Sequence, residues 1–321
     1  MFVRGSLVCV NQHVIRLGVV GLGAMGSEML SIAVDHPEFD VVLAADPARP
    51  APGSVPYTPD AWRVIDHPGI EAVYIASPPS THAAYAVQAM RAGKAVFCEK
   101  PLAVDLDDGA EMVAVAADVD AVNALNFVLS DRAAAIEVGR ALRAGEAGTV
   151  LGVDVQLLFP QWPRLFQREA GWVAGRQQGG FLREVASHFL FLSDRLLGPL
   201  TPSHTQVTYG AAAETGASGL LATAGGVPVR VSGQVAAGPE SYEWTLYGSQ
   251  ASYRITEWGR LFKGGESGWR EVTLDGTRGD EQTRLTEFAS AVRGKPTTLA
   301  DFAAGLRVQR VIESFHSRAA N

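Results

Sequence analysis

The chain has 321 residues, of which 47% are hydrophobic and 19% are charged, and this length and balance suit two globular domains better than one small core. Its net charge of -7, without a cluster of lysine or arginine, argues against a nucleic-acid partner and favours a small neutral or polar molecule. No apolar run could span a bilayer, and residues 1–13 lack the long apolar core of a signal peptide, so we expect a cytoplasmic protein without membrane contact. The cysteines Cys9 and Cys98 form neither a metal-ligand spacing nor a disulfide framework, and we expect no metal site.

The first predicted strand, over 15–20, runs directly into a glycine-rich turn and then a helix over 24–34. A second strand over 41–45 completes the strand-helix-strand unit that begins a parallel sheet. Because a dinucleotide binds at such a turn, we interpret this unit as the start of a Rossmann domain.

The turn itself has the pattern Gly-x-Gly-x-x-Gly. Gly21 allows a tight turn, Gly23 lets a pyrophosphate approach the backbone, and Gly26 lets the helix pack closely on the strand. The pyrophosphate is then expected at the positive end of the helix. The residues predicted to contact it are Gly21, Gly23, Ala24, Met25 and Gly26.

The second strand ends at Asp46, about 20 residues after the last glycine, where an acid can accept hydrogen bonds from the ribose hydroxyls. This carboxylate favours NAD over NADP, although Arg49 could pair with a 2′-phosphate and NADP is not excluded. Five prolines follow between Pro47 and Pro59, so the next helix should be short or absent.

The alternation then resumes with strands over 72–77, 95–98 and 121–127, and with helices over 81–92 and 105–117. The strands should all end at the edge where the glycine turn lies, which is where open α/β sheets bind ligands. The residues predicted at this cofactor edge are Ser77, Pro78, His82, Glu99, Lys100 and Asn126. For His82 the alternative is a helix residue with no role in binding.

Beyond a helix over 132–144 the pattern changes to β-rich runs separated by glycine, proline and serine turns. These runs cover 150–159, 205–209, 227–235, 242–247 and 252–256. They are joined by a loop over 161–180 and by helices over 181–197, 281–293 and 301–317. We therefore predict an α/β fold with an N-terminal Rossmann domain over 1–127. An α/β (α+β) domain over 128–321, with a large, mostly antiparallel open sheet, should serve substrate binding and oligomerisation.

Five motifs occur in the order of a known family, at 21–26, 77–82, 92–102, 179–188 and 197–199. With them the chain resembles the Gfo/Idh/MocA oxidoreductases over nearly its whole length. The resemblance implies that Lys100, from Glu-Lys-Pro, and the later pair Glu184 and His188 line the site of hydride transfer. It also implies a homodimer or higher homo-oligomer built on the second domain's sheet.

Four features depart from the family pattern. Glu184 stands where aspartate is usual, Gln178 replaces the first member of a glycine triplet, and Phe191 replaces an acid after the histidine. The proline-rich segment displaces the second Rossmann helix. With the aromatic loop residues Trp162, Phe166 and Trp172, Phe191 favours the alternative of an imine or aldehyde without sugar character.

The catalytic residues have a chemical rationale of their own. Oxidation of an alcohol needs a group that takes the hydroxyl proton while hydride leaves, and a partly desolvated lysine such as Lys100 can do this. Glu184 and His188 are four residues apart in a predicted helix, so the carboxylate could orient the imidazole or bind a substrate hydroxyl. The alternatives are a solvated lysine and a core histidine.

These observations predict an NAD(H)-dependent oxidoreductase that acts on a hydroxyl or carbonyl of a small polyol, sugar derivative or related cyclic compound. A non-catalytic dinucleotide or metabolite sensor is the alternative from another class, because fold does not determine function. Residues that could contact substrate from the loop are Arg164, Arg168, Trp172 and Arg176. An apolar outer sheet face, suggested by Val227, Val229, Val231, Trp244 and Leu246, would favour a dimer.

Overall fold

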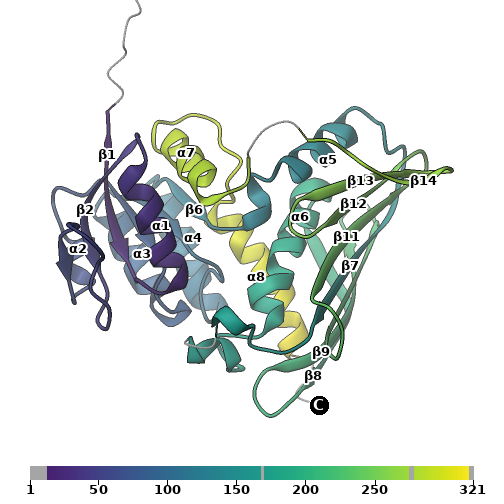
Figure 1. Cartoon of the computed structure of the whole chain (residues 1–321), viewed down its shortest axis with the longest axis horizontal. Coiled ribbons are helices and arrows are strands. Elements are labelled where there is room, and N and C mark those ends of the chain that lie inside the picture. Colours follow the sequence, from purple (N-terminus) through teal and green to yellow (C-terminus); the bar gives the residue numbers. More distant parts are fainter. Residues whose placement is uncertain (1–12, 168–169, 275–277, 318–321) are drawn as a thin grey trace, which may run out of the picture.

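The computed structural model describes residues 13–167, 170–274 and 278–317 (Figure 1). Its first half is a six-stranded sheet, sheet A, with the order β3-β2-β1-β4-β5-β6 and every pair parallel. The expectations placed on Cys9 and Arg168 lie outside the described residues. The strands of sheet A are β1 (Ile15–Val20), β2 (Phe39–Ala45), β3 (Tyr57–Thr58), β4 (Ala72–Ile75), β5 (Ala95–Cys98) and β6 (Asn123–Leu125).

Helices cover both faces of sheet A, as the near-continuous apolar strands require. One face packs on α1 (Ala24–Asp35) and on α7 (Glu281–Val292), which returns from far along the chain. The other face packs on α2 (Trp62–Ile65), α3 (His82–Arg91) and α4 (Leu106–Asp118). Asp105 caps α4, because its carboxylate accepts the amide of Asp108 at 2.9 Å.

The helix after the proline-rich segment is short, as predicted, since α2 has only four residues. The short edge strand β3 was not predicted; it pairs with the end of β2 inside this segment. The strand predicted over 121–127 was too long, because the backbone leaves the sheet after Leu125 and forms a 3₁₀ turn over Val128–Ser130.

The second half is an eight-stranded sheet, sheet B, with the order β14-β13-β12-β11-β7-β10-β9-β8. Only β7 and β10 pair in parallel, so the predicted mostly antiparallel sheet is confirmed. Its strands are β7 (Val150–Phe159), β8 (Leu200–Tyr209), β9 (Glu214–Thr223), β10 (Pro228–Val235), β11 (Ser241–Gly248), β12 (Ser252–Thr256), β13 (Arg260–Gly265) and β14 (Gly268–Glu271). Strands β9, β13 and β14 were missed.

The inner face of sheet B packs on α5 (Ala133–Arg143), α6 (Ser187–Leu197) and α8 (Phe302–Ser317). In Figure 1 the outer face looks away from the helices, and no described helix covers it. Val229, Val231, Trp244 and Leu246 all point inward and are buried. The expectation of an apolar outer face from these residues was therefore wrong, because they belong to the core.

One hydrophobic cluster extends from the α3–α4 face of sheet A to the inner face of sheet B. Helix α8 connects the two, since it packs against α4, α6 and β8. The two sheets therefore share a core and hold the edge of sheet A beside the start of α6. No helix among the residues described is long and apolar enough to cross a membrane.

Candidate active site

The glycine turn has the geometry that a dinucleotide needs. Gly21 has φ +93, and a Cβ there would lie 2.5 Å from the backbone of Ala76 and Ser77. A Cβ on Gly26 would lie 1.9 Å from the carbonyl oxygen of Gly21, so α1 can approach the turn only without a side chain. A Cβ on Gly23 would meet nothing within 4 Å, which leaves space beside the turn for a ligand.

The start of α1 offers donors to an anion placed in that space. No described side chain caps its first amides, and its first turn contains no acid. Free amides and the helix dipole together favour a phosphate group. The residues of this turn therefore fit the pyrophosphate of a dinucleotide.

Asp46 lies beside the same turn at the end of β2. Its Oδ2 accepts the amide of Leu22 at 2.7 Å, and its Oδ1 accepts the amides of Ala48 and Arg49 at 2.8 and 2.9 Å. A carboxylate has about four acceptor positions, so three backbone bonds leave roughly one for a ribose hydroxyl. The carboxylate is thus fixed where the fingerprint places it.

The histidine predicted at the cofactor edge supports that edge from behind. His82 is fully buried, and its Nδ1 and Nε2 lie 2.9 Å from the carbonyl oxygens of Pro101 and Ser77. Burial lowers the pKa of His82. The ring joins the end of β4 to the Glu-Lys-Pro turn, while Ser77 is half-buried and Pro78 is exposed.

Glu99 and Asn126 form a buried pair beneath Lys100. Oε1 of Glu99 accepts the Tyr74 hydroxyl at 2.5 Å and the Asn126 side-chain amide at 2.6 Å. Burial raises the pKa of Glu99. These contacts fix the ends of β4, β5 and the turn after β6 relative to one another, so Lys100 extends from a rigid base.

Lys100 meets Glu184 where the two halves of the molecule come together. Their Nζ and Oε2 are 2.9 Å apart, and the side chains are 13% and 4% exposed. The same Oε2 accepts the side-chain amide of Gln167 at 3.0 Å. The guanidinium of Arg164 in turn donates to Oε1 of Gln167 at 3.0 Å. Lys100, Glu184, Gln167 and Arg164 are therefore joined in a chain from the edge of sheet A to the loop after β7.

Glu184 lies in a π-helical turn, Leu182–Ala186, that continues into α6. Arg183 anchors this turn by a two-pronged ion pair with Glu313 of α8 and by bonds to the carbonyl oxygens of Arg176 and Gly179. Such wide turns are common at functional sites. Here the turn and the extra methylene of glutamate bring the carboxylate to Lys100.

His188 lies in the first turn of α6 and has a different partner. Its Nδ1 accepts the backbone amide of Val128 at 3.1 Å, and the ring packs edge-on against Phe127 and Trp258. Burial, reinforced by the positive charge of Lys100, lowers the pKa of His188 well below its ordinary value. Among the residues described, no hydrogen bond joins Glu184 to His188. The expected orientation of the imidazole by this carboxylate is therefore not what the structure shows.

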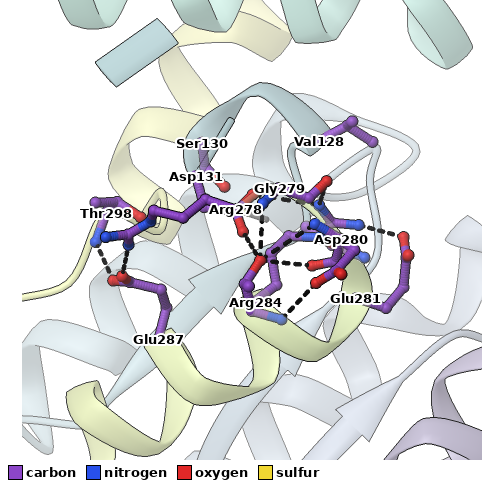
Figure 2. A network of polar contacts seen from close by, with 12 residues as sticks. Val128, Ser130, Asp131, Arg278, Gly279, Asp280, Glu281, Arg284, Glu287 and Thr298 are labelled. Carbon is purple, nitrogen blue, oxygen red and sulfur yellow. Dashed lines mark hydrogen bonds and ion pairs between the residues drawn. The ribbon is translucent and has the colours of Figure 1, made fainter. Parts of the chain in front are cut away.

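A buried polar network fixes the segment that carries the Val128 amide (Figure 2). Asp131 accepts the Thr283 hydroxyl at 2.5 Å and pairs with Arg284 of α7 at 3.3 Å. Both side chains of that ion pair are 0% exposed. Arg195 of α6 donates to the carbonyl oxygen of Ser130. The turn after β6 is thus anchored to both α7 and α6.

The chain matches one family over both halves. Residues 15–127 match an oxidoreductase family with an NAD-binding Rossmann fold, and residues 140–321 match that family's C-terminal alpha/beta domain. The chain belongs to the Gfo/Idh/MocA oxidoreductases.

The names of relatives of this Gfo/Idh/MocA chain describe enzymes that act on sugar derivatives and cyclitols. The dTDP-3,4-didehydro-2,6-dideoxy-alpha-D-glucose 3-reductase of Saccharopolyspora spinosa is 29% identical over 197 residues, 58% of each chain. The scyllo-inositol 2-dehydrogenase (NAD(+)) of Bacillus subtilis strain 168 is 25% identical over 198 residues, 58% of this chain and 55% of the relative. Each alignment thus spans little more than half of the relative.

A solved levoglucosan dehydrogenase, in complex with NADH and levoglucosan, has the same fold. Its TM-score against this Gfo/Idh/MocA chain is 0.83 at 20% identity, and the match covers 96% of this chain and 97% of that one. At this identity the likeness is one of fold.

Sequence reasoning brought Lys100, Glu184 and His188 to one place but missed three of their neighbours. Gln167 was one polar residue in a long loop, and Trp258 was one aromatic residue in a β-turn. The amide of Val128 is a backbone group and leaves no trace in residue type. Of the loop residues predicted to contact substrate, Arg164 reaches the site through Gln167, whereas Arg176 packs on Tyr209 and donates to Ala212.

Proposed function

We propose that the chain is an NAD(H)-dependent oxidoreductase that acts on a hydroxyl or carbonyl of a small polyol, sugar derivative or related cyclic compound. The observation that carries the proposal is the buried contact of Lys100 with Glu184 at the carboxyl edge of sheet A. It lies on the side of the sheet where the glycine turn, Asp46 and the uncapped α1 offer a dinucleotide site.

The residues have distinct tasks in this proposal. The turn of Gly21, Gly23 and Gly26 and the start of α1 hold the pyrophosphate, and Asp46 binds a ribose hydroxyl. A bound nicotinamide supplies a hydride acceptor when oxidised and a hydride donor when reduced. Lys100 takes the hydroxyl proton on its neutral amine in oxidation and returns it from the ammonium in reduction.

Glu184 serves Lys100 in both directions. Its Oε2 keeps the amine at one place, and Gln167 shares the negative charge by donating to the same oxygen. This arrangement lowers the cost of holding an ion pair away from water, because each buried charge has a partner. The shared core excludes solvent from behind the pair.

The first experiment is a screen of polyols, sugars and cyclic alcohols with oxidised cofactor. The absorbance of reduced nicotinamide measures turnover of each compound. Binding of NADH is measured in parallel by fluorescence titration. Turnover with at least one compound supports the proposal. Tight NADH binding without a change of redox state with any class of compound, aldehydes and imines included, would instead favour a dinucleotide sensor.

We also infer a homodimer in which the outer face of sheet B meets its copy. By strand register this face carries Asp154, Arg230, Tyr247, Arg254 and Trp269, and arginine and aromatic residues are typical of interfaces. Asp154 and Arg230 already pair at 2.5 Å across neighbouring strands. That the protein works in the cytoplasm stays a prediction.

A further inference from the structure

The loop after β7 carries a cation that the proposed mechanism does not use. Nε of Arg164 donates to Oε1 of Gln167 at 3.0 Å. Among the described residues, no acceptor takes a hydrogen bond from Nη1 or Nη2, and no acid forms an ion pair with the guanidinium. The side chain is nevertheless partly buried. Because a desolvated charge without a counter-charge is costly, a guanidinium kept in this state is suited to bind an anion from outside the chain.

Two aromatic rings hold the guanidinium of Arg164 in one orientation. Its Cζ lies 4.6 Å from the ring centre of Phe166 and 5.7 Å from that of Trp162. Trp162 is itself fixed, because its indole nitrogen donates to the carbonyl oxygen of Val173 at 3.1 Å and its ring packs against Phe159. Since Nε is already bonded, the end that carries Nη1 and Nη2 is the part of the guanidinium left for a ligand.

Arg164 lies beside the proposed reaction site. Its partner Gln167 donates to Oε2 of Glu184 at 3.0 Å. The same oxygen pairs with Lys100 at 2.9 Å. Burial lowers the pKa of His188, and the positive charges of Lys100 and Arg164 lower it further. The pyrophosphate site proposed at the glycine turn belongs to sheet A, whereas this guanidinium comes from a loop of sheet B, so we assign it to the substrate.

The local charge at this site is positive, although the whole chain has a net charge of -7. Lys100 is matched by Glu184. The acids whose charges act on Arg164 are Glu184 and Glu240, and Glu240 is exposed to water just before β11, where its charge is screened. In α6 the buried Phe191 adds no charge. One positive charge is therefore left unmatched.

We propose that Arg164 binds a carboxylate of the substrate, so that the compound oxidised or reduced is a sugar acid or a cyclic hydroxy-carboxylic acid. This rests on the proposed function. The Nη1 and Nη2 end of a guanidinium matches the two oxygens of a carboxylate. One cation balances one negative charge, whereas a phosphate monoester carries about -1.5 to -2 at pH 7. Because Glu184 and Gln167 lie between Lys100 and Arg164 in the chain of hydrogen bonds, the carboxylate belongs on a carbon remote from the reacting one.

The first test measures binding and needs no turnover. Calorimetric titration of the NADH complex compares acids with neutral counterparts of similar shape: glucuronate with glucose, galacturonate with galactose, and quinate with myo-inositol. We expect at least one acid to bind about tenfold or more tightly than its counterpart, the scale of a hydrogen bond to a charged group. Arg164→Gln should remove this difference. The control Arg176→Gln, which removes an arginine of the same loop that lies on Tyr209, should keep it. No preference of the wild type for any acid would overturn the proposal.

The second test separates recognition of the carboxylate from support of the site. Arg164→Gln should lower kcat/KM for the acid about tenfold or more and leave kcat/KM for the neutral counterpart unchanged. An equal fall for both would show that Arg164 only supports Gln167 and Glu184, and would overturn the proposal while the oxidoreductase stands. A preference for glucose-6-phosphate over glucuronate that is lost in Arg164→Gln would overturn the assignment of a carboxylate. Acid binding that depends on Arg164 but never changes the redox state of the cofactor would overturn the oxidoreductase and keep the carboxylate site.

Discussion

At the scale of single residues, we propose that the chemistry depends on Lys100. Lys100→Ala removes the proton exchange but leaves the glycine turn and Asp46 untouched. Turnover should fall by about 10²-fold or more, the usual scale for a positioned acid or base. NADH affinity should be unchanged in a fluorescence titration.

The matched control is Lys263→Ala, which removes an exposed lysine of β13 that pairs with Glu146. It should keep full turnover. Substantial turnover by Lys100→Ala would place the proton exchange on another residue.

The nearly isosteric Glu184→Gln should reduce turnover while the fold persists, because Lys100 loses its charged partner.

We propose that Asp46 determines the choice of cofactor. Its carboxylate is held beside the turn by three backbone amides, where it can accept a ribose hydroxyl and would repel a 2′-phosphate. We expect tighter binding of NADH than of NADPH in fluorescence titrations. Arg49→Ala should leave NADH affinity unchanged and weaken NADPH further. Equal or tighter NADPH binding by the wild type would contradict this assignment.

The site shows what can be predicted from residue types and what cannot. Lys100, Glu184 and His188 were predicted to lie together, because the family motifs and the strand ends converge there. Their partners were not predicted: spacing alone suggested a Glu184–His188 contact, but the π-helical turn sends the carboxylate to Lys100. The amide that holds His188 comes from a turn whose position depends on tertiary packing.

At the scale of elements, a buried cluster beneath the π-helical turn makes the free energy of unfolding depend on pH. Glu214 of β9 packs against Gly180, where a Cβ would lie 1.8 Å from the carboxylate. Nδ1 of the neighbouring His316 forms a hydrogen bond with the Tyr209 hydroxyl at 2.7 Å. Burial raises the pKa of Glu214 to about 7 and lowers that of His316 to about 3, so the pair is uncharged near pH 6.

Glu214→Gln isolates the carboxyl of this pair. Between pH 4.5, the ordinary pKa of a glutamate, and its raised pKa of about 7, Glu214 keeps its proton in the folded chain and has lost it in the unfolded chain. Its contribution to stability therefore falls as pH rises through this window and stays low above it. The variant should be more stable than the wild type above pH 7, by roughly 3 kcal/mol.

The measurement is urea unfolding of both proteins at several pH values. The difference between them matters, because the contribution of His316 changes with pH in the opposite sense. Glu240→Gln, at an exposed position, is the control and should show no such trend. A constant difference across the window would mean that Glu214 is ionised in the folded protein.

Some elements were predictable because their sequence leaves little choice. Five prolines prevented a full second helix, and the glycine pattern fixed the first turn. Strand β9 was missed because its glycines, alanines and serine have weak strand propensity. Strand β14 was missed because it has only four residues and begins with a glycine. Both form because neighbouring strands of sheet B supply their hydrogen bonds.

At the scale of the whole molecule, the chain order and the spatial order differ. Helix α7 lies within the range predicted for the second domain, yet Leu285, Phe288 and Ala289 pack into the core of sheet A. Phe288 lies against Phe39 and Phe97. No boundary drawn at one position in the sequence could have shown this return of the chain.

The outer face of sheet B provides the test of assembly. A charge reversal such as Arg254→Glu should place like charges opposite one another across a symmetric interface and produce a monomer. Arg63→Glu, an exposed reversal on α2, should leave the assembly unchanged. Sedimentation at micromolar concentration distinguishes these results. A wild-type monomer would contradict the inferred dimer.

The measurement that tests the central claim most directly follows the hydride itself. A substrate found in the screen is prepared with deuterium on its carbinol carbon and incubated with NAD and the wild-type chain. The account predicts that the deuterium appears on the nicotinamide ring of the product and that no label is lost to water. Reduced cofactor without the deuterium would contradict it. So would bound cofactor that never changes its redox state with any substrate class.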